Sequence, residues 1–112
     1  MTNLRRMMMK NRMIIERGSL CEWCESRQAT DLHELVNRGR TQHNDLARQL
    51  SYVEELCSLL CDECHDQAHN PTARNFLLNR NIQTYGREKV QHALDLLKDS
   101  MGTQLNIYLP EE

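Results

Sequence analysis

The chain has 112 residues, which is enough for one domain, and a domain of this length buries only about 65% of its unfolded surface. Only 39% of the residues are apolar, Phe and Trp occur once each, and the mean hydropathy is −0.71. These values exclude a large aromatic core, and no run of about 20 apolar residues is present to span a membrane. We therefore expect a small domain that needs a stabilising element in addition to its apolar core.

Charge is distributed unevenly along the chain, although the net charge is only −2. Residues 1–17 carry five basic side chains and one acidic one, whereas residues 18–69 carry ten acidic and four basic ones. An acidic middle beside a basic segment suits a metal site next to a segment that attracts phosphate. The first 17 residues lack the apolar region and cleavage site of a secretion signal, so we expect a cytoplasmic protein.

Residues 4–17 are predicted to form a helix or a short arm. Met9, Met13 and Ile14 recur at helical spacing and would form an apolar face that packs on the domain. Gly18 ends the pattern just before the first cysteine. The basic side chains of this segment are candidates for contacts with nucleic-acid phosphates, and they are Arg5, Arg6, Lys10 and Arg12.

The centre of the chain is predicted to form a β-hairpin with a helix inserted in it. Residues 30–36 have a strand-like pattern, and residues 56–60 form an apolar return strand. Between them we expect a Gly turn at residues 38–40 and a short helix over residues 44–52, capped by Asn44. The arginines on either side of the turn are placed to bind phosphates, and they are Arg38 and Arg40.

The rest of the chain is predicted to be helical. One helix covers residues 61–69, and a second begins at Pro71 with Asn70 as its cap and runs to about residue 84. A final amphipathic helix is predicted from apolar side chains at i, i+4, i+7 and i+11, namely Val90, Leu94, Leu97 and Met101. We expect residues 109–112 to be frayed.

Four of the five cysteines fall in two matched pairs, Cys21-x-x-Cys24 and Cys61-x-x-Cys64. Such pairs in a chain without an export signal favour zinc over disulfides, because each pair can donate two thiolates to one tetrahedral ion. The alternative, four buried cysteines without a metal, is disfavoured because two matched pairs rarely arise from packing alone. The fifth cysteine, Cys57, is expected to pack in the hairpin.

Three histidines indicate a second metal site. His65 and His69 are four residues apart on a predicted helix and share one face, and His33 lies on the strand expected to pack against that helix. Imidazole ligands that leave positions open for water and phosphate suit a catalytic ion such as Mg²⁺, Mn²⁺ or Zn²⁺. As an alternative, His65 replaces a thiolate at the structural zinc and His69 is a cap or surface residue.

The segments that carry this chemistry are Cys21-x-x-Cys24, then Asp31-Leu-His33-Glu34-Leu, then Leu59-Leu-Cys61-x-x-Cys64-His65-x-x-x-His69. In this order and spacing they resemble the HNH family of ββα-metal, or His-Me finger, nucleases. The resemblance covers about residues 20–70. It implies an α+β fold, a small zinc-stapled treble-clef ββα-metal domain with flanking N- and C-terminal helices. The chain then divides into a basic arm or helix (1–17), an HNH core (18–70) and a helical extension (71–112).

The resemblance also implies a function, that of a metal-dependent endonuclease that hydrolyses DNA phosphodiester bonds, with nicking as one form of that activity. His33, His65 and His69 would hold the catalytic ion, and Glu34 occupies the position of the family's general-base histidine. Glutamate has a reference pKa near 4.3 and accepts a proton from water with less driving force than imidazole. Asp31 is two residues from His33, on the same strand face, where it can orient or ligate beside it.

A second departure from the family is Leu56, near the position where the family has asparagine. Together with Glu34, it leaves open an alternative in which the protein keeps the fold and the zinc, lacks catalysis, and binds nucleic acid or a protein partner. The expected partner is nucleic acid, with DNA favoured, and a homodimer or a protein partner would add contacts to so small a surface. Small HNH proteins are common in bacteriophages and prophages, which implies the cytoplasm of a bacterium or an infected host.

Overall fold

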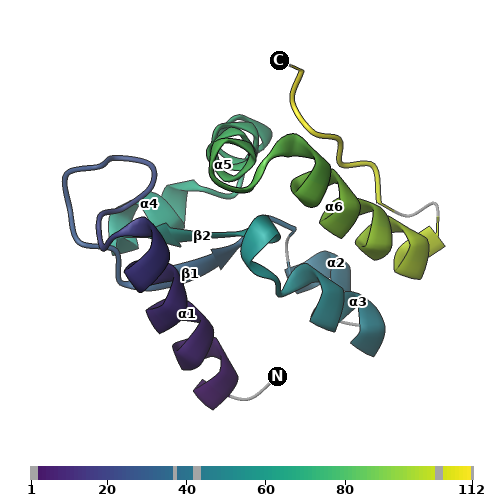
Figure 1. Cartoon of the computed structure of the whole chain (residues 1–112), viewed down its shortest axis with the longest axis horizontal. Coiled ribbons are helices and arrows are strands. Elements are labelled where there is room, and N and C mark those ends of the chain that lie inside the picture. Colours follow the sequence, from purple (N-terminus) through teal and green to yellow (C-terminus); the bar gives the residue numbers. More distant parts are fainter. Residues whose placement is uncertain (1–2, 37, 42–43, 103–104, 112) are drawn as a thin grey trace.

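The computed structural model describes residues 3–36, 38–41, 44–102 and 105–111, without the side chain of Arg38. Over these residues the protein is α+β, with six α-helices and a two-stranded antiparallel sheet. Figure 1 shows the sheet between α1 on one side and α6 on the other. The elements in chain order are α1 (Asn3–Arg17), β1 (Asp31–Glu34), α2 (Arg38–Thr41), α3 (Asp45–Ser51), the 3₁₀ turn η1 (Glu54–Leu56), β2 (Cys57–Leu60), α4 (Asp62–Gln67), α5 (Pro71–Tyr85) and α6 (Arg87–Met101).

The sheet pairs β1 with β2 and brings a predicted metal-binding histidine close to a predicted zinc-binding cysteine: β1 carries His33, and β2 leads directly into Cys61. In the register of the hairpin, His33 lies opposite Ser58 and Asp31 lies opposite Leu60. All four residues of β2 are buried, so the return strand forms the centre of the molecule. The predicted hairpin is confirmed, with shorter strands than the sequence pattern indicates.

Helix α1 packs on the sheet through its methionine face, as predicted. Met9 and Met13 are buried in a cluster with Leu32, Tyr52 and Leu59. Arg5, Arg6, Lys10 and Arg12 therefore lie away from this buried face, whereas Arg17, at the end of the helix, is buried against Glu22.

Helices α5 and α6 complete the larger part of the core. The predicted cap of α5 is confirmed, because Asn70 Oδ1 accepts a hydrogen bond of 2.9 Å from the backbone N–H of Ala73. The predicted apolar face of α6 is confirmed by three buried side chains, Val90, Leu94 and Leu97. They belong to the same apolar cluster as Cys21, Leu60 and Leu77, so the first cysteine pair packs directly on the helical part of the molecule.

Two segments differ from the sequence-based expectation. Residues 38–41, expected as a Gly turn, form the short helix α2. Residues 109–112 are expected to fray, but Leu109 is buried, and so are Leu105 and Ile107 at alternate positions of the same segment, which has no regular secondary structure. An extended segment turns every second side chain to the same side, so the tail can add three apolar residues to the core without a helix. Among the described residues, no helix is both long enough and apolar enough to cross a membrane.

Candidate metal centre

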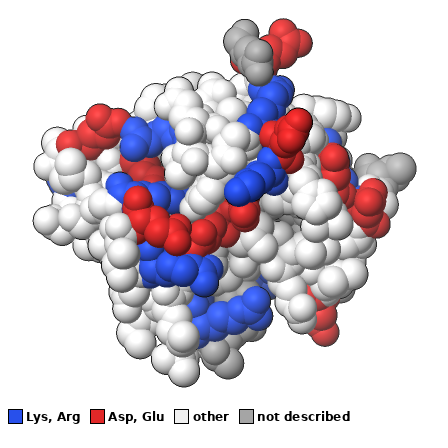
Figure 2. All heavy atoms as spheres, viewed as in Figure 1, with Lys and Arg blue, Asp and Glu red and all other residues white. Residues whose placement is uncertain are grey.

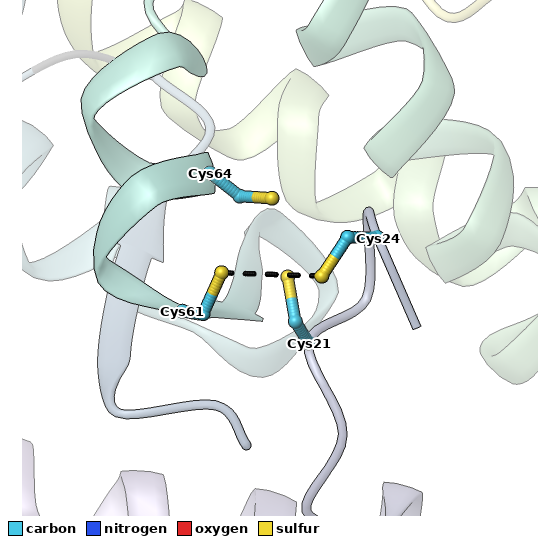
Figure 3. Close-up of side chains that lie close together, drawn as sticks. All are labelled: Cys21, Cys24, Cys61 and Cys64. Atoms are coloured by element: carbon cyan, nitrogen blue, oxygen red, sulfur yellow. Dashed lines mark hydrogen bonds between the residues drawn. The ribbon is translucent and has the colours of Figure 1, made fainter. Parts of the chain in front are cut away.

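The four predicted zinc-ligating cysteines lie together. All four sulfur atoms lie within 4.8 Å of one another, those of Cys21, Cys24, Cys61 and Cys64. The sulfurs of Cys24 and Cys61 are 3.9 Å apart. Figure 3 shows the four thiols pointing toward one another, two from the loop after α1 and two from the start of α4. This group is close enough to hold a metal ion such as zinc.

Local backbone structure brings each cysteine pair to the cluster. In the first pair, the N–H of Cys21 donates to the carbonyl of Arg27 at 2.8 Å, and the N–H of Glu25 donates back to the carbonyl of Cys21 at 3.0 Å. Glu25 has a φ of 56°, in the left-handed region that a turn this tight requires. In the second pair, Cys61 is the N-cap of α4, so one helical turn separates it from Cys64.

The protonation of the cluster favours a bound cation. The Ser26 hydroxyl and the backbone N–H groups of Ser26 and Arg27 hydrogen-bond to Cys24 and lower its pKa to about 6. Burial and the neighbouring cysteine sulfurs raise the pKa of Cys64 to about 12. Four adjacent thiols thus cannot all ionise by themselves, whereas a divalent ion would neutralise four thiolates at once.

The three predicted metal-binding histidines also lie close together. The ring centroid of His33 lies 5.1 Å from that of His65 and 5.5 Å from that of His69. The centroids of His65 and His69 are 5.8 Å apart. The helix predicted over residues 61–69 is shorter in the structure: His65 lies in α4, but His69 lies two residues beyond its end at Gln67. Together with His33 of β1, they form a histidine trio, which we define as His33, His65 and His69.

Asp31 contacts a different histidine from the one that the sequence indicates. Its Oδ2 lies 2.9 Å from Nδ1 of His65, whereas the strand pattern favoured His33 as its neighbour. Burial of Asp31 opposes ionisation, but the hydrogen bonds from His65 and Thr30 outweigh it and lower the pKa of Asp31. An ionised Asp31 that accepts from Nδ1 leaves Nε2 of His65 as the nitrogen able to bind a metal.

His33 is the buried member of the trio. Burial, with the charges of His65 and His69, lowers its pKa to about 4. The imidazole of His33 is therefore neutral at pH 7, which is the form that binds metal ions.

Glu34, the predicted base, lines a pocket of about 170 Å³ with His33 and His69. Its side chain is 9% exposed, and its Oε1 lies 3.6 Å from Nη1 of Arg48. That separation is an ion pair and is too long for a hydrogen bond, so neither of these two atoms has a hydrogen-bond partner among the described residues. Arg48 thus supplies a charge contact to this oxygen of Glu34 without a hydrogen bond.

Two predicted phosphate-binding residues of α1 face the trio and two do not. Arg6 and Lys10, four residues apart, line a groove with Asp31 and His65. Arg5 and Arg12 lie on another face of the helix, where Arg12 forms an ion pair with Glu54. Of the arginines near α2, Arg40 lines the pocket that contains Glu34 and His69, and the side chain of Arg38 lies outside the described residues.

Sequence reasoning missed Arg74, which lines the same pocket as Arg40. It stands in the first turn of α5, five residues after His69, with Asn70 and Pro71 between the two helices. Because helical spacing does not continue across that break, the sequence gives no signal that Arg74 and His69 share a site. The buried ion pair of Arg17 with Glu22 was likewise not predicted from the sequence.

The fold and the site define a small α+β protein with a four-cysteine cluster that can hold a metal ion, beside a trio of histidines. No protein-family model, curated protein or solved structure gives a significant match to the chain. The function must therefore be argued from the residues themselves.

Proposed function

We propose that this protein is a metal-dependent endonuclease of the HNH type, with a zinc-stapled treble-clef ββα-metal core, that hydrolyses or nicks DNA. The observation that carries the proposal is the histidine trio. Its members come from the strand β1, from α4 and from the segment just after α4, and their rings lie 5.1 to 5.8 Å apart. A scaffold that needed only zinc would have no use for three converging imidazoles beside a closed thiolate cluster.

The donor set fits a divalent ion with open coordination positions. His33 is neutral at pH 7 because burial lowers its pKa, and Asp31 holds His65 so that Nε2 is available. Among the described residues, only the four cysteines already have all their ligand atoms within 4.8 Å, so the histidine rings must turn inward to share an ion. The chemistry that such an ion supplies is polarisation of the scissile phosphate and stabilisation of the leaving oxygen.

Glu34 is the group we assign to accept the proton of the attacking water. It lies in the same pocket as His33 and His69, and a positioned carboxylate can accept a proton from water. Nη1 of Arg48 lies 3.6 Å from Oε1 of Glu34. This contact helps to position the carboxylate, but the positive charge makes it a weaker base. We therefore expect slow turnover compared with a histidine base.

The second candidate is a catalytically impaired module that binds nucleic acid or a protein partner. The observation that favours it is the burial of Glu34 against Arg48, which restricts the access of water to the carboxylate. Both candidates keep the zinc and the basic groove. They differ in whether divalent ions support cleavage.

A plasmid-nicking assay on the zinc-loaded protein tests the proposal, with Mg²⁺, Mn²⁺ or Zn²⁺ added separately. We expect His69→Ala to abolish cleavage and Glu34→Gln to slow it by about 10²- to 10⁴-fold, the usual value of a positioned base. His92→Ala is the matched control, because His92 is exposed on α6, away from the trio. Absence of wild-type cleavage with every ion, despite DNA binding, would exclude the nuclease and favour the impaired module.

A further inference from the structure

The pocket beside the histidine trio contains two arginines that face a common space. Arg40 reaches it from α2 and Arg74 from the first turn of α5, and His69 and Glu34 lie on its walls. The pocket has a volume of about 170 Å³. Nothing in the assigned chemistry of the trio or of the cysteines uses this arginine pair.

The charges of the arginine pair are not paired with an acidic side chain. Among the described residues, no ion pair involves Arg40 or Arg74, and Nε of Arg74 is buried with no hydrogen-bond partner. Burial, together with the positive charge of Arg40, lowers the pKa of Arg74. A buried guanidinium N–H without a partner is unfavourable, and a second cation beside it adds to the cost.

The start of α5 adds a further positive potential to the same space. Asn70 and Pro71 line the pocket, and α5 is 15 residues long, so its N-terminal end carries a substantial partial positive charge. Among the described residues that line the pocket, Glu34 is the only acid, and Arg48, 3.6 Å from its Oε1, offsets its charge. The balance of charge in the pocket therefore favours an anion with several acceptor oxygens.

His65, the third member of the trio, lines a different groove, which contains Arg6 and Lys10. Each pair of cations thus shares a hollow with part of the trio: Arg40 and Arg74 with His33 and His69, and Arg6 and Lys10 with His65. Because successive phosphates of a nucleic-acid strand extend beyond a single active site, a strand lying across the trio would reach both pairs.

We propose that Arg40 and Arg74 bind a DNA phosphodiester group next to the one held at the histidine trio, with the Arg74 guanidinium donating from the pocket floor. This inference rests on the proposed function for the identity of the ligand. It adds Arg74 as a positioning residue that holds the substrate strand, outside the three segments that resemble the HNH family.

The test is the binding of a fluorescently labelled DNA duplex by the zinc-loaded protein without added divalent ion, measured by anisotropy over a series of salt concentrations. We expect Arg74→Gln to weaken binding about tenfold and to reduce the slope of log K against log salt by about 1. Arg74→Lys should restore the slope and only part of the affinity, because lysine keeps the charge and loses the planar fork. The control is Lys89→Gln, an exposed charge on α6 that changes the net charge equally and should leave binding unchanged.

Zinc content and thermal melting establish that each variant is folded, and Arg40→Gln gives a second test if Arg74→Gln is unstable. Equal binding by Arg74→Gln and Lys89→Gln, or no DNA binding by the wild type at low salt, would overturn the inference. Loss of affinity in Arg74→Gln with no wild-type cleavage under any divalent ion would retain this site and reject the nuclease. Normal affinity in Arg74→Gln with active wild-type protein would reject this site alone.

Discussion

Arg17 and Glu22 form a buried ion pair in which Nη1 of Arg17 lies 3.1 Å from Oε1 of Glu22 and each side chain is only 5% exposed. The same guanidinium donates to Oδ1 of Asn81 at 3.0 Å, to the hydroxyl of Tyr85 at 3.0 Å and to the carbonyl of Glu54 at 2.6 Å. One side chain therefore joins the end of α1, the first cysteine loop, η1 and α5. The position of α1 against the histidine trio depends on it.

Arg17→Ala is expected to lower the free energy of unfolding by about 3 to 5 kcal/mol, because it leaves the Glu22 carboxylate buried without its partner. Urea denaturation of the zinc-loaded protein measures the change. Arg12→Ala is the control, since Arg12 pairs with Glu54 while 62% exposed, and its loss should cost less than about 1 kcal/mol. Similar losses for the two variants would mean that burial of the Arg17 pair has no special weight.

One tightly bound zinc per chain is expected, because closed thiolate sites contribute folding free energy directly. Cys64→Ser should lose the zinc and the cooperative melting transition, whereas Cys57→Ala should keep the zinc, since Cys57 lies outside the cluster. Metal analysis combined with thermal melting in the presence of a chelator measures both. If the protein contains no zinc and its melting temperature does not change in chelator, the fold does not depend on a bound metal.

Asp31→Asn is expected to weaken metal binding at the histidine trio by about 10- to 100-fold, the usual effect of removing a carboxylate that orients a ligating imidazole. Titration with Mn²⁺ or Co²⁺ after the cysteine site has been filled with zinc measures the affinity. Asp66→Asn is the matched control, because Asp66 is an exposed acid next to His65 on the same helix. If the two variants bind the ion equally, the 2.9 Å contact of Asp31 with His65 does not serve the metal.

Stability is expected to fall at alkaline pH because of Cys57. Burial raises the pKa of the Cys57 thiol, so the folded protein keeps it neutral while the unfolded chain ionises near its reference value of about 8.5. The stabilising contribution is complete below that pH and is lost progressively above it, by at most about 1.4 kcal/mol per pH unit.

Urea midpoints of the wild type and Cys57→Ala at several values between pH 7 and pH 10 test this expectation. Loss of packing at the buried Cys57 lowers the stability of the variant at every pH, so the readout is the pH dependence, which should be shallower in Cys57→Ala. If the stability of the two proteins falls equally with rising pH, titratable groups other than Cys57 cause the loss of stability. Tyr52, whose pKa burial raises to about 12, contributes only above the reference tyrosine value of about 10.

The two faces of α1 are expected to contribute differently to DNA binding. Arg6→Gln with Lys10→Gln removes the cations in the groove beside His65, and should reduce the slope of log K against log salt by about 2. The double variant of Arg5 and Arg12 removes the same charge from the other face and should change the slope much less. Equal reductions would show that α1 acts only through its total charge.

Local patterns in the sequence were sufficient for most of the secondary structure and for the cysteine cluster. Asn44 and Asn70 accept hydrogen bonds as helix caps where the sequence predicts them, because capping depends on neighbours within three residues. The burial of Val90, Leu94 and Leu97 follows from a 3.6-residue period that needs no knowledge of the partner surface. Each Cys-x-x-Cys turn likewise depends only on its own residues. The tertiary fold is needed only to bring the two turns together.

Relationships between elements were decided by the tertiary structure. The rotation of α4 against β1 places Asp31 on His65 rather than beside His33, and the break at Pro71 lets α5 bring Arg74 to Arg40. The packing of α1 through Met9 and Met13 divides four basic residues between two faces, a division that net charge and composition do not contain. Such contacts join residues that are distant in sequence, and their geometry depends on how side chains pack between helices and strands, which no local pattern encodes.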